Sequence, residues 1–212
     1  MKKFVFVGGG GHCQSCINSA ELAGFNVVGI VDNQVGAKVL SYEVIGNDSD
    51  LPDLAKADDI NFIVTVGMVS SNSLRAKIYK KLIDINANRA SLIAKTAVIS
   101  KHAVIGKASV ILEQAVINAK AIVGENVIIN TAAIIEHGAR IGNHTHISTR
   151  AVVNGDVSIG QNCMIGSGSV ILQGITIADN VTIGAGAIVI KDILEAGTWV
   201  GSPARKLNND LG

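Results

Sequence analysis

The sequence predicts a chain in two parts: a small Rossmann-like α/β sheet over residues 1–88, and a parallel β-helix over residues 92–212 that includes a C-terminal extension. The first half contains strand, glycine turn, helix and strand signals in the order of a βαβ unit. The second half has Ile or Val at every sixth position from Ile99 to Val189, a period that no α-helix produces. Only 3% of the residues are aromatic although 48% are hydrophobic, as expected for a repetitive aliphatic core.

The expected elements of the first half follow from apolar runs and their boundaries. In chain order they are a strand at residues 4–7, a turn at 8–11, a helix at 13–23, a strand at 27–31, a strand at 60–66, a helix at 74–85 and a linker at 86–91. Strands that alternate with helices indicate a parallel sheet flanked by helices.

The glycine turn is a candidate phosphate site, because free backbone N–H groups and a helix N-terminus point at a ligand there. Its residues are Gly8, Gly10, Gly11 and the adjacent His12, and we expect Asp32 and Gly67 at neighbouring strand ends. Cys13 stands where the dinucleotide fingerprint needs a third glycine, and the sheet is short, so a mononucleotide or nucleotide sugar is favoured. Two alternatives remain: the turn binds nothing, or His12 only caps the helix.

The second half repeats a short strand followed by a bend. The sixteen repeated aliphatic positions are Ile99, Ile105, Ile111, Ile117, Val123, Ile129, Ile135, Ile141, Ile147, Val153, Ile159, Ile165, Ile171, Ile177, Ile183 and Val189. Mostly small residues lie two positions earlier, so both point inward. Three strands make a triangular turn of about eighteen residues, and about five turns should stack. Glycines that directly follow the aliphatic residue, such as Gly106 and Gly142, are expected where a side chain would strain the bend.

The charge, the hydropathy and the cysteine content argue against several kinds of partner and function. The net charge of +1 disfavours nucleic acid or an anionic membrane as the main partner. No run of eighteen apolar residues predicts a membrane span, and the apolar run of residues 4–7 is too short for a signal peptide. Three cysteines give no disulfide framework and fit a reducing cytoplasm. Cys13 and Cys16 form a CxxC without a second pair, so a structural role is favoured over metal or redox chemistry.

Six motifs together resemble the bacterial sugar acyltransferases. They are GGGGHC, VDN, TVG, LRAKIYKKL, NTAAIIEHGARIGNHTHIS and TWVGSPARKL, and they span nearly the whole chain. That family includes N-acetyltransferases of UDP-linked 4-amino sugars, such as those that make bacillosamine, and proteins similar to sialic acid O-acetyltransferases. The resemblance implies a left-handed β-helix, called the prism below because its cross-section is triangular. It also implies a homotrimer with acetyl-CoA between adjacent prisms, and acetylation of a UDP-amino sugar in glycan biosynthesis. O-acetylation of sialic acid or a related sugar is the alternative.

The resemblance places the catalytic base at His137, whose bend position points its side chain out of the prism. Family members commonly have an acidic residue next, whereas this chain has Gly138. The eighteen-residue turn stacks Asp156 on Gly138, so Asp156 is a candidate replacement, or else an exposed bend residue; Glu136 is a further candidate. The resemblance gives Gly155 the role of oxyanion donor, and the register places it one rung from His137.

The resemblance also implies the cofactor site. His146 is expected near the acetyl-CoA thioester, Gly184 is expected to contact CoA through its amide, and Pro203 belongs to the C-terminal motif of the same site. Asn130 is expected on the acceptor side. His146 precedes an inward Ile and should point out of a flat face, where packing between subunits is an equally good explanation.

A zinc-dependent carbonic anhydrase is a competing class, since related trimeric prisms bind zinc through three histidines. The available histidines are His102, His137, His144 and His146. Their spacing does not favour a three-histidine site, and such an enzyme would not need the first domain, so no metal is expected. A scaffold role would leave both the glycine turn and the outward histidines unused.

Overall fold

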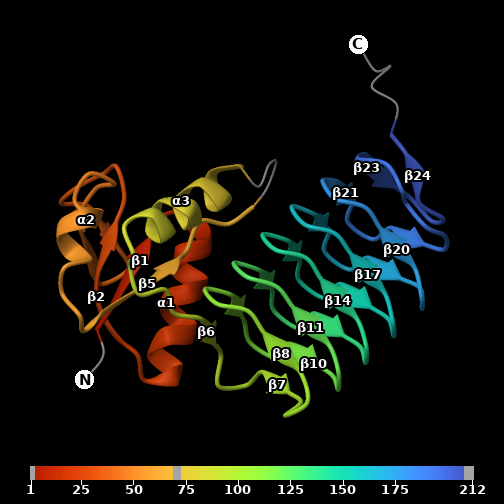
Figure 1. The fold of residues 1–212 in the computed structure, drawn as a ribbon, viewed down its shortest axis with the longest axis horizontal. Coiled ribbons are helices and arrows are strands. Elements are labelled where there is room, and N and C mark those ends of the chain that lie inside the picture. Colours follow the sequence, from red (N-terminus) through yellow and green to blue (C-terminus); the bar gives the residue numbers. More distant parts are fainter. Residues whose placement is uncertain (1–2, 69–72, 208–212) are drawn as a thin grey trace. The chain divides into compact units, whose positions relative to one another are not determined.

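The computed structural model describes residues 3–68 and 73–207. It divides into two compact units, Met1–Lys95 and Thr96–Gly212. The first unit contains the expected sheet, which is parallel except for one short antiparallel hairpin, and the second contains the expected stack of short strands (Figure 1).

The first unit is a five-stranded sheet in the order β3-β4-β2-β1-β5. Its elements are β1 (Lys3–Val7), α1 (Gly11–Ala23), β2 (Asn26–Val31), β3 (Lys38–Val39), β4 (Tyr42–Gly46), α2 (Leu51–Leu54), β5 (Ile60–Val64), α3 (Ser73–Asp84) and β6 (Leu92–Ile93). Strand β1 pairs in parallel with β2 and β5, so the carboxyl ends of these three strands meet at one edge. The expected helices and central strands are present, while β3, β4 and α2 were not predicted.

The second unit is a parallel β-helix with three sheets. Sheet 1 contains β7 (Val98–Ile99), β10 (Val116–Ile117), β13 (Ile134–Ile135), β16 (Val152–Val153), β19 (Val170–Ile171) and β22 (Ile188–Val189). Sheet 2 contains β8 (Val104–Ile105), β11 (Ile122–Val123), β14 (Arg140–Ile141), β17 (Ser158–Ile159) and β20 (Thr176–Ile177). Sheet 3 contains β6 as its first strand, followed by β9 (Val110–Ile111), β12 (Ile128–Ile129), β15 (His146–Ile147), β18 (Met164–Ile165), β21 (Val181–Ile183), β23 (Gly197–Val200) and β24 (Arg205–Lys206).

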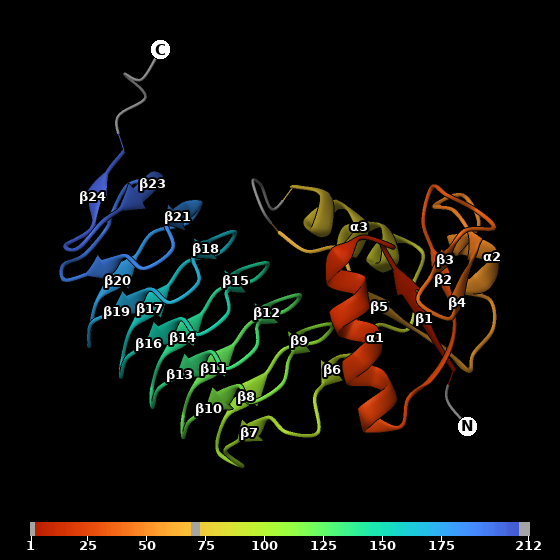
Figure 2. The same ribbon diagram turned by 180° about the vertical axis from the view of Figure 1, so that it is seen from behind.

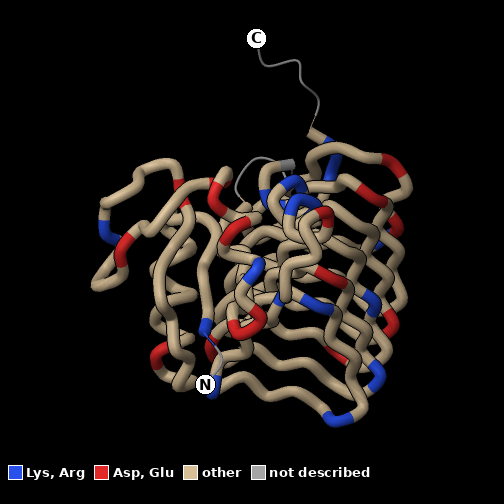
Figure 3. The backbone as a smooth tube through the Cα atoms, turned by 60° about the vertical axis from the view of Figure 1, so that its left-hand side comes forward, with Lys and Arg blue, Asp and Glu red and all other residues tan. Residues whose placement is uncertain are grey.

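Successive coils pair with the predicted eighteen-residue offset. Ile117 pairs with Ile135, and Ile135 pairs with Val153, in parallel register. The strands of sheet 1 are seen as successive rungs in Figure 2. The repeated aliphatic residues and the small residues two positions earlier form one continuous buried core. Basic and acidic positions are interspersed along the coils (Figure 3), in line with the small net charge.

The bends correct one expectation about glycine. Positive φ recurs three residues after the aliphatic position, for example at Ala108 (φ 57°) and Asn126 (φ 55°), and not at the glycines directly after it. Those glycines are needed because the coils approach closely. A Cβ on Gly106 would lie 2.7 Å from the backbone nitrogen of Glu125 in the next coil. The bend itself would not be strained by a side chain there.

Candidate functional site

The glycine turn between β1 and α1 is shaped by its neighbours at the carboxyl edge of the sheet. Gly8 has φ of +108°, and a Cβ there would lie 3.0 Å from the Val66 backbone nitrogen. The Gly9 N–H donates to Asp32 Oδ2 at 2.7 Å, which fixes the Asp32 carboxylate against the turn. At Gly10 and Gly11 a Cβ would meet nothing within 4 Å. No neighbouring atom of the chain therefore requires glycine at positions 10 and 11, and the absence of side chains there leaves open space at the start of α1.

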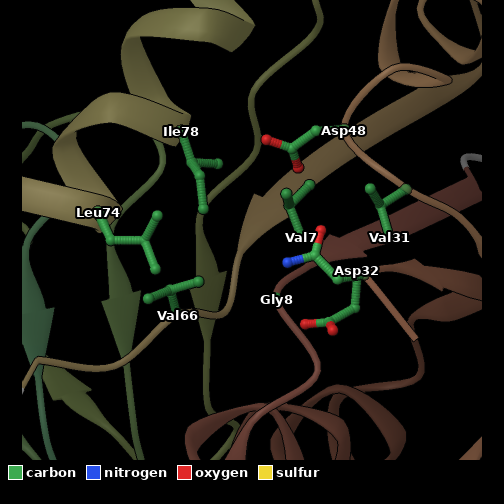
Figure 4. A pocket seen from close by; sticks show the side chains of 9 residues that line it. Val7, Gly8, Val31, Asp32, Asp48, Val66, Leu74 and Ile78 are labelled. Atoms are coloured by element: carbon green, nitrogen blue, oxygen red, sulfur yellow. The ribbon is translucent and has the colours of Figure 1, made fainter.

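The predicted residues of the first half line one cavity. It encloses about 420 Å³ and is lined by Gly8, Gly10, Gly11, His12, Asp32, Val66, Gly67 and Leu74. A smaller cavity of about 100 Å³ shares part of this lining and adds Asn33, Asp48 and Ile78. Figure 4 shows the carboxylates of Asp32 and Asp48 on one side of it, facing the apolar side chains of Leu74 and Ile78. Asp48, Leu74 and Ile78 were not predicted as site residues, because they come from separate elements with no motif in common.

His12 is part of this cavity and does not supply the helix cap. Gly10 is the N-cap residue of α1, and no side-chain hydrogen bond caps the helix. A Cβ on Gly67 would approach His12 Cβ to 3.0 Å, so the glycine three residues after β5 makes room for the histidine.

Buried polar groups hold the turn from behind. Thr65 Oγ1 donates to the Gly8 carbonyl oxygen at 2.6 Å. Arg75 Nη1 donates to the carbonyl oxygens of Val64 (2.7 Å) and Val66 (2.9 Å). Burial lowers the pKa of the Arg75 guanidinium to about 10, which still leaves it charged at neutral pH. The chain after β5 is thus fixed by a buried cation, which the sequence alone did not indicate.

The cysteines are buried thiols. Cys13, Cys16 and Cys163 are buried and form no disulfide. Burial raises the pKa of Cys13 and of Cys163 to about 11 each, so both thiols are protonated at neutral pH. Since the thiolate is the nucleophile and metal ligand, this favours the structural role expected for them.

In the second unit, His137 lies at the corner that follows β13, with its side chain exposed. Its ring covers Gly155 of the next coil: a Cβ on Gly155 would lie 2.6 Å from His137 Cε1 and 2.7 Å from Nε2. Only glycine at position 155 admits the ring in this place. The stacking of His137 on Gly155 that the eighteen-residue turn predicts is therefore present.

Gly155 uses its two backbone polar groups differently. Its carbonyl oxygen accepts a hydrogen bond from Gly174 N at 2.9 Å. Within residues 3–68 and 73–207, the Gly155 N–H has no acceptor. The corner therefore combines an exposed imidazole, which is a group able to accept a proton, with an unbonded backbone N–H, which is a group able to donate to an oxyanion.

Two carboxylates flank His137 in different ways. Asn118 Nδ2 donates to Glu136 Oε2 at 2.9 Å, so Glu136 is bonded to the coil below. The carboxylate of Asp156 packs over Gly138, where Oδ1 occupies the place of a side chain at position 138. Gly138 has φ of +69°. In the part of the chain that the structure describes, neither carboxylate is hydrogen-bonded to the His137 ring.

His146 and Asn130 form a separate pair in sheet 3. The Asn130 amide lies 3.1 Å from His146 Nε2. Asn130 Oδ1 accepts from the Thr131 N–H at 2.8 Å, so the Asn130 NH₂ group must be the donor and Nε2 the acceptor. His146 occupies the predicted outward position, but it is only 6% exposed and does not present an open ring.

The predicted cofactor residues near the C-terminus are only partly free for a ligand. The Gly184 N–H donates to the Trp199 carbonyl oxygen at 2.8 Å, so this amide is already bonded within the chain, and its expected contact with CoA stays a prediction. Pro203 follows a cis peptide bond in the exposed turn between β23 and β24.

Neither a metal cluster nor a membrane helix is found in the described ranges, residues 3–68 and 73–207. No group of three or more His, Cys, Asp or Glu residues there could hold a metal ion. None of the helices there is long and apolar enough to cross a membrane.

Comparison with known proteins shows the class. Residues 3–82 match the PglD N-terminal domain, and residues 156–191 match the hexapeptide repeat of succinyl-transferase. The acetyltransferase domain of PglB from Neisseria gonorrhoeae, solved with acetyl coenzyme A, is 31% identical; the match covers 97% of this chain and 99% of that one, with a TM-score of 0.91. Perosamine N-acetyltransferase from Caulobacter crescentus, solved as a histidine-to-asparagine variant with CoA and GDP-perosamine, is 29% identical over 99% and 98% of the two chains, with a TM-score of 0.92.

WeeI from Acinetobacter baumannii shares the fold at 20% identity, with a TM-score of 0.85 over 98% of this chain and 100% of that one. No curated protein sequence matches the chain. The fold is a left-handed β-helix preceded by an α/β unit, as predicted, and it defines the class of hexapeptide-repeat acyltransferases. Within that class, the chain belongs to the bacterial sugar acyltransferase family.

Proposed function

We propose that this protein transfers the acetyl group of acetyl-CoA to the amino group of a nucleotide-linked amino sugar used in bacterial glycan biosynthesis. The observation that carries the proposal is the corner at which the exposed His137 ring covers Gly155 and its unbonded N–H. The full-length similarity to two acetyltransferases, one solved with acetyl coenzyme A and one with GDP-perosamine, supports this choice of donor and acceptor.

The chemistry requires a base and an oxyanion donor. His137 removes a proton from the acceptor nitrogen as that nitrogen attacks the thioester carbonyl carbon, because imidazole is a good base near neutral pH. The Gly155 N–H donates to the developing oxyanion. When the carbon–sulfur bond breaks, the CoA thiolate takes the proton from His137. No covalent enzyme intermediate is needed, in keeping with the buried, protonated Cys163.

The nucleotide binds in the cavity of the first unit. The diphosphate lies on the open Gly10 and Gly11 amides at the start of α1, beside His12, where the helix N-terminus attracts anions. Asp32 faces the ribose or the base from a position fixed by the Gly9 amide. We propose UDP as the nucleotide, and the similarity to an enzyme that binds GDP-perosamine makes GDP sugars the first competitor to test.

The outward face of sheet 1 supports a homotrimer. One β-branched aliphatic side chain points outward from every strand of this sheet, at Val98, Val116, Ile134, Val152, Val170 and Ile188. The inward positions of the same sheet are apolar as well. A parallel sheet that is apolar on both faces is typical of one that is covered on both sides. We propose that copies of the chain pack here around a three-fold axis.

Acetyl-CoA would then lie between adjacent prisms, with His146 and Asn130 near the acetyl end and Pro203 near the other end of the cofactor. Cysteines that form no disulfide fit a reducing compartment, and we place the reaction in the cytoplasm.

One assay tests the function directly. Purified protein is given acetyl-CoA with a panel of UDP- and GDP-linked amino sugars and with free sialic acid, and CoA thiol release is followed. We expect turnover on a nucleotide-linked amino sugar and a loss of about 100-fold or more in kcat for His137→Ala, since a general base contributes 10²–10⁴-fold. Turnover only on sialic acid would overturn the proposal in favour of O-acetylation.

A matched variant tests the nucleotide cavity. Asp32→Asn keeps an oxygen that accepts from the Gly9 N–H but removes the charge. We expect the KM for the nucleotide sugar to rise while the KM for acetyl-CoA stays unchanged. Equal changes in both KM values would contradict the assignment of this cavity to the acceptor.

A further inference from the structure

Two neighbouring coils exchange side chains at the His137 corner. His137 and Gly138 lie on one coil, and Gly155 and Asp156 lie above them on the next, held in register by a hydrogen bond from Asp156 N to the His137 carbonyl oxygen at 2.9 Å. The His137 ring covers Gly155, while the Asp156 carboxylate covers Gly138. Each large polar side chain thus faces a glycine on the other coil. This arrangement brings an imidazole and a carboxylate side by side at the surface.

We propose that Asp156 is the positioning residue of His137, and that its carboxylate stabilises the imidazolium that forms when His137 accepts the acceptor's proton. The proposal rests on the proposed function, because it needs His137 to be the base. Asp156 neither bonds to the substrate nor takes the proton itself. The proton passes from the acceptor nitrogen to His137 and then to the CoA thiolate, and the negative charge of Asp156 offsets the transient positive charge.

The surrounding charges favour Asp156 over its neighbours. Glu136 is bonded to Asn118 in the coil below. Lys120 lies one coil below Gly138 in the same column, and Asp156 lies one coil above it. Within the described residues, the Asp156 carboxylate forms no ion pair and accepts no hydrogen bond. Of the two flanking acids, Asp156 is therefore the one whose carboxylate is not already held by a hydrogen-bond donor of the chain.

Gly138 is the second half of the same device. A side chain at position 138 would displace the Asp156 carboxylate, because the two occupy the same place. Gly138 has φ of +69° and Asp156 has φ of +58°, a region that glycine, asparagine and aspartate tolerate best. The two residues are therefore interchangeable in backbone terms. Exchanging them would bring the carboxylate to the same place from the coil that carries His137.

The test combines kinetics with a titration that does not depend on activity. In Asp156→Asn, we expect the KM for acetyl-CoA to stay unchanged and kcat to fall about ten-fold. Because a neighbouring carboxylate favours the protonated imidazole, the acid limb of the kcat/KM profile, which is the fall in rate at low pH, should move to lower pH in this variant. NMR titration of His137 should show the same downward shift. The exchanged variant, Gly138→Asp with Asp156→Gly, should return the acid limb of the kcat/KM profile to its original pH and restore most of kcat.

Asp179→Asn is the matched control. Asp179 is also a corner aspartate that packs over a glycine of the preceding coil, but its Oδ1 accepts from Gln161 N at 2.8 Å and no histidine is beside it. This variant should leave the acid limb in place. An unshifted His137 titration in Asp156→Asn, or an exchanged variant that stays slow with an unrestored limb, would overturn the proposal. If His137→Ala keeps its rate, the proposed base is wrong, and the NMR titration still decides whether Asp156 acts on the ring.

Discussion

Gly155→Ala is the sharpest perturbation of the His137 corner, because it adds one methyl group at the contact. The new Cβ would lie 2.6 Å from His137 Cε1, and ordinary contact begins at 3.4 Å, so the ring must retreat by about 0.8 Å. Gly155 does not have a positive φ, so alanine imposes no backbone strain there. Since a displacement of about 1 Å costs about 100-fold in rate, we expect kcat to fall by about that factor with little change in Tm.

The assay is CoA thiol release at saturating acceptor, with Tm measured in parallel. The double variant with His137→Ala is the control, because a methyl group that acts by moving the ring should cost little once the ring is absent. If Gly155→Ala lowers kcat by the same factor in both backgrounds, the ring is not what the methyl group disturbs. A Gly155→Ala enzyme with its rate intact would refute the reasoning from this contact.

Three further predictions concern assembly, stability and metal. Ile134→Glu, on the outward face of sheet 1, should give a monomer by light scattering, whereas Thr176→Glu on sheet 2 should stay assembled. Arg75→Met should lower the free energy of unfolding of the first unit by about 3 kcal/mol in urea titration, because it removes bonds to two buried carbonyls; exposed Lys77→Met should change it little. Dialysis against a chelator should leave the rate unchanged, since the transfer needs no metal; loss of rate restored by zinc would contradict this.

The β-helix could be predicted almost rung by rung because its period fixes both the direction of each side chain and its neighbour in the next coil. The stacking of His137 on Gly155 followed from that period alone. Strand β3 and helix α2 were missed because two and four residues carry too little periodic signal. Strand β4 is as long as β1, but its sequence YEVIG contains only one apolar pair, Val44 and Ile45, instead of a continuous apolar run. The bend glycines were predicted for the wrong reason, since a clash with the next coil is a tertiary effect that no local rule describes.

The lining of the cavity in the first unit was predicted where the glycine turn or a strand end marks a residue, and was missed where other elements contribute. Gly8, His12 and Asp32 lie in one cavity, as expected, because the carboxyl ends of parallel strands share an edge. Asp48 comes from the loop after β4 and Arg75 from α3, and nothing in their local sequence marks them as part of the same edge. The contact of the Gly184 amide with CoA was expected from the family resemblance alone. The resemblance does not indicate that this amide donates to Trp199 in β23.

In a β-helix, the same position in space can be filled by side chains from two different coils. Residues eighteen apart lie on top of one another, so a carboxylate beside His137 can come from position 138 or, through a side chain that reaches back over Gly138, from position 156. A motif that expects the acid next to the histidine describes only the first route. If the exchanged variant Gly138→Asp with Asp156→Gly is active with a normal pH profile, the requirement of the chemistry is a negative charge at that place between two coils, and the residue number that supplies it is free to change.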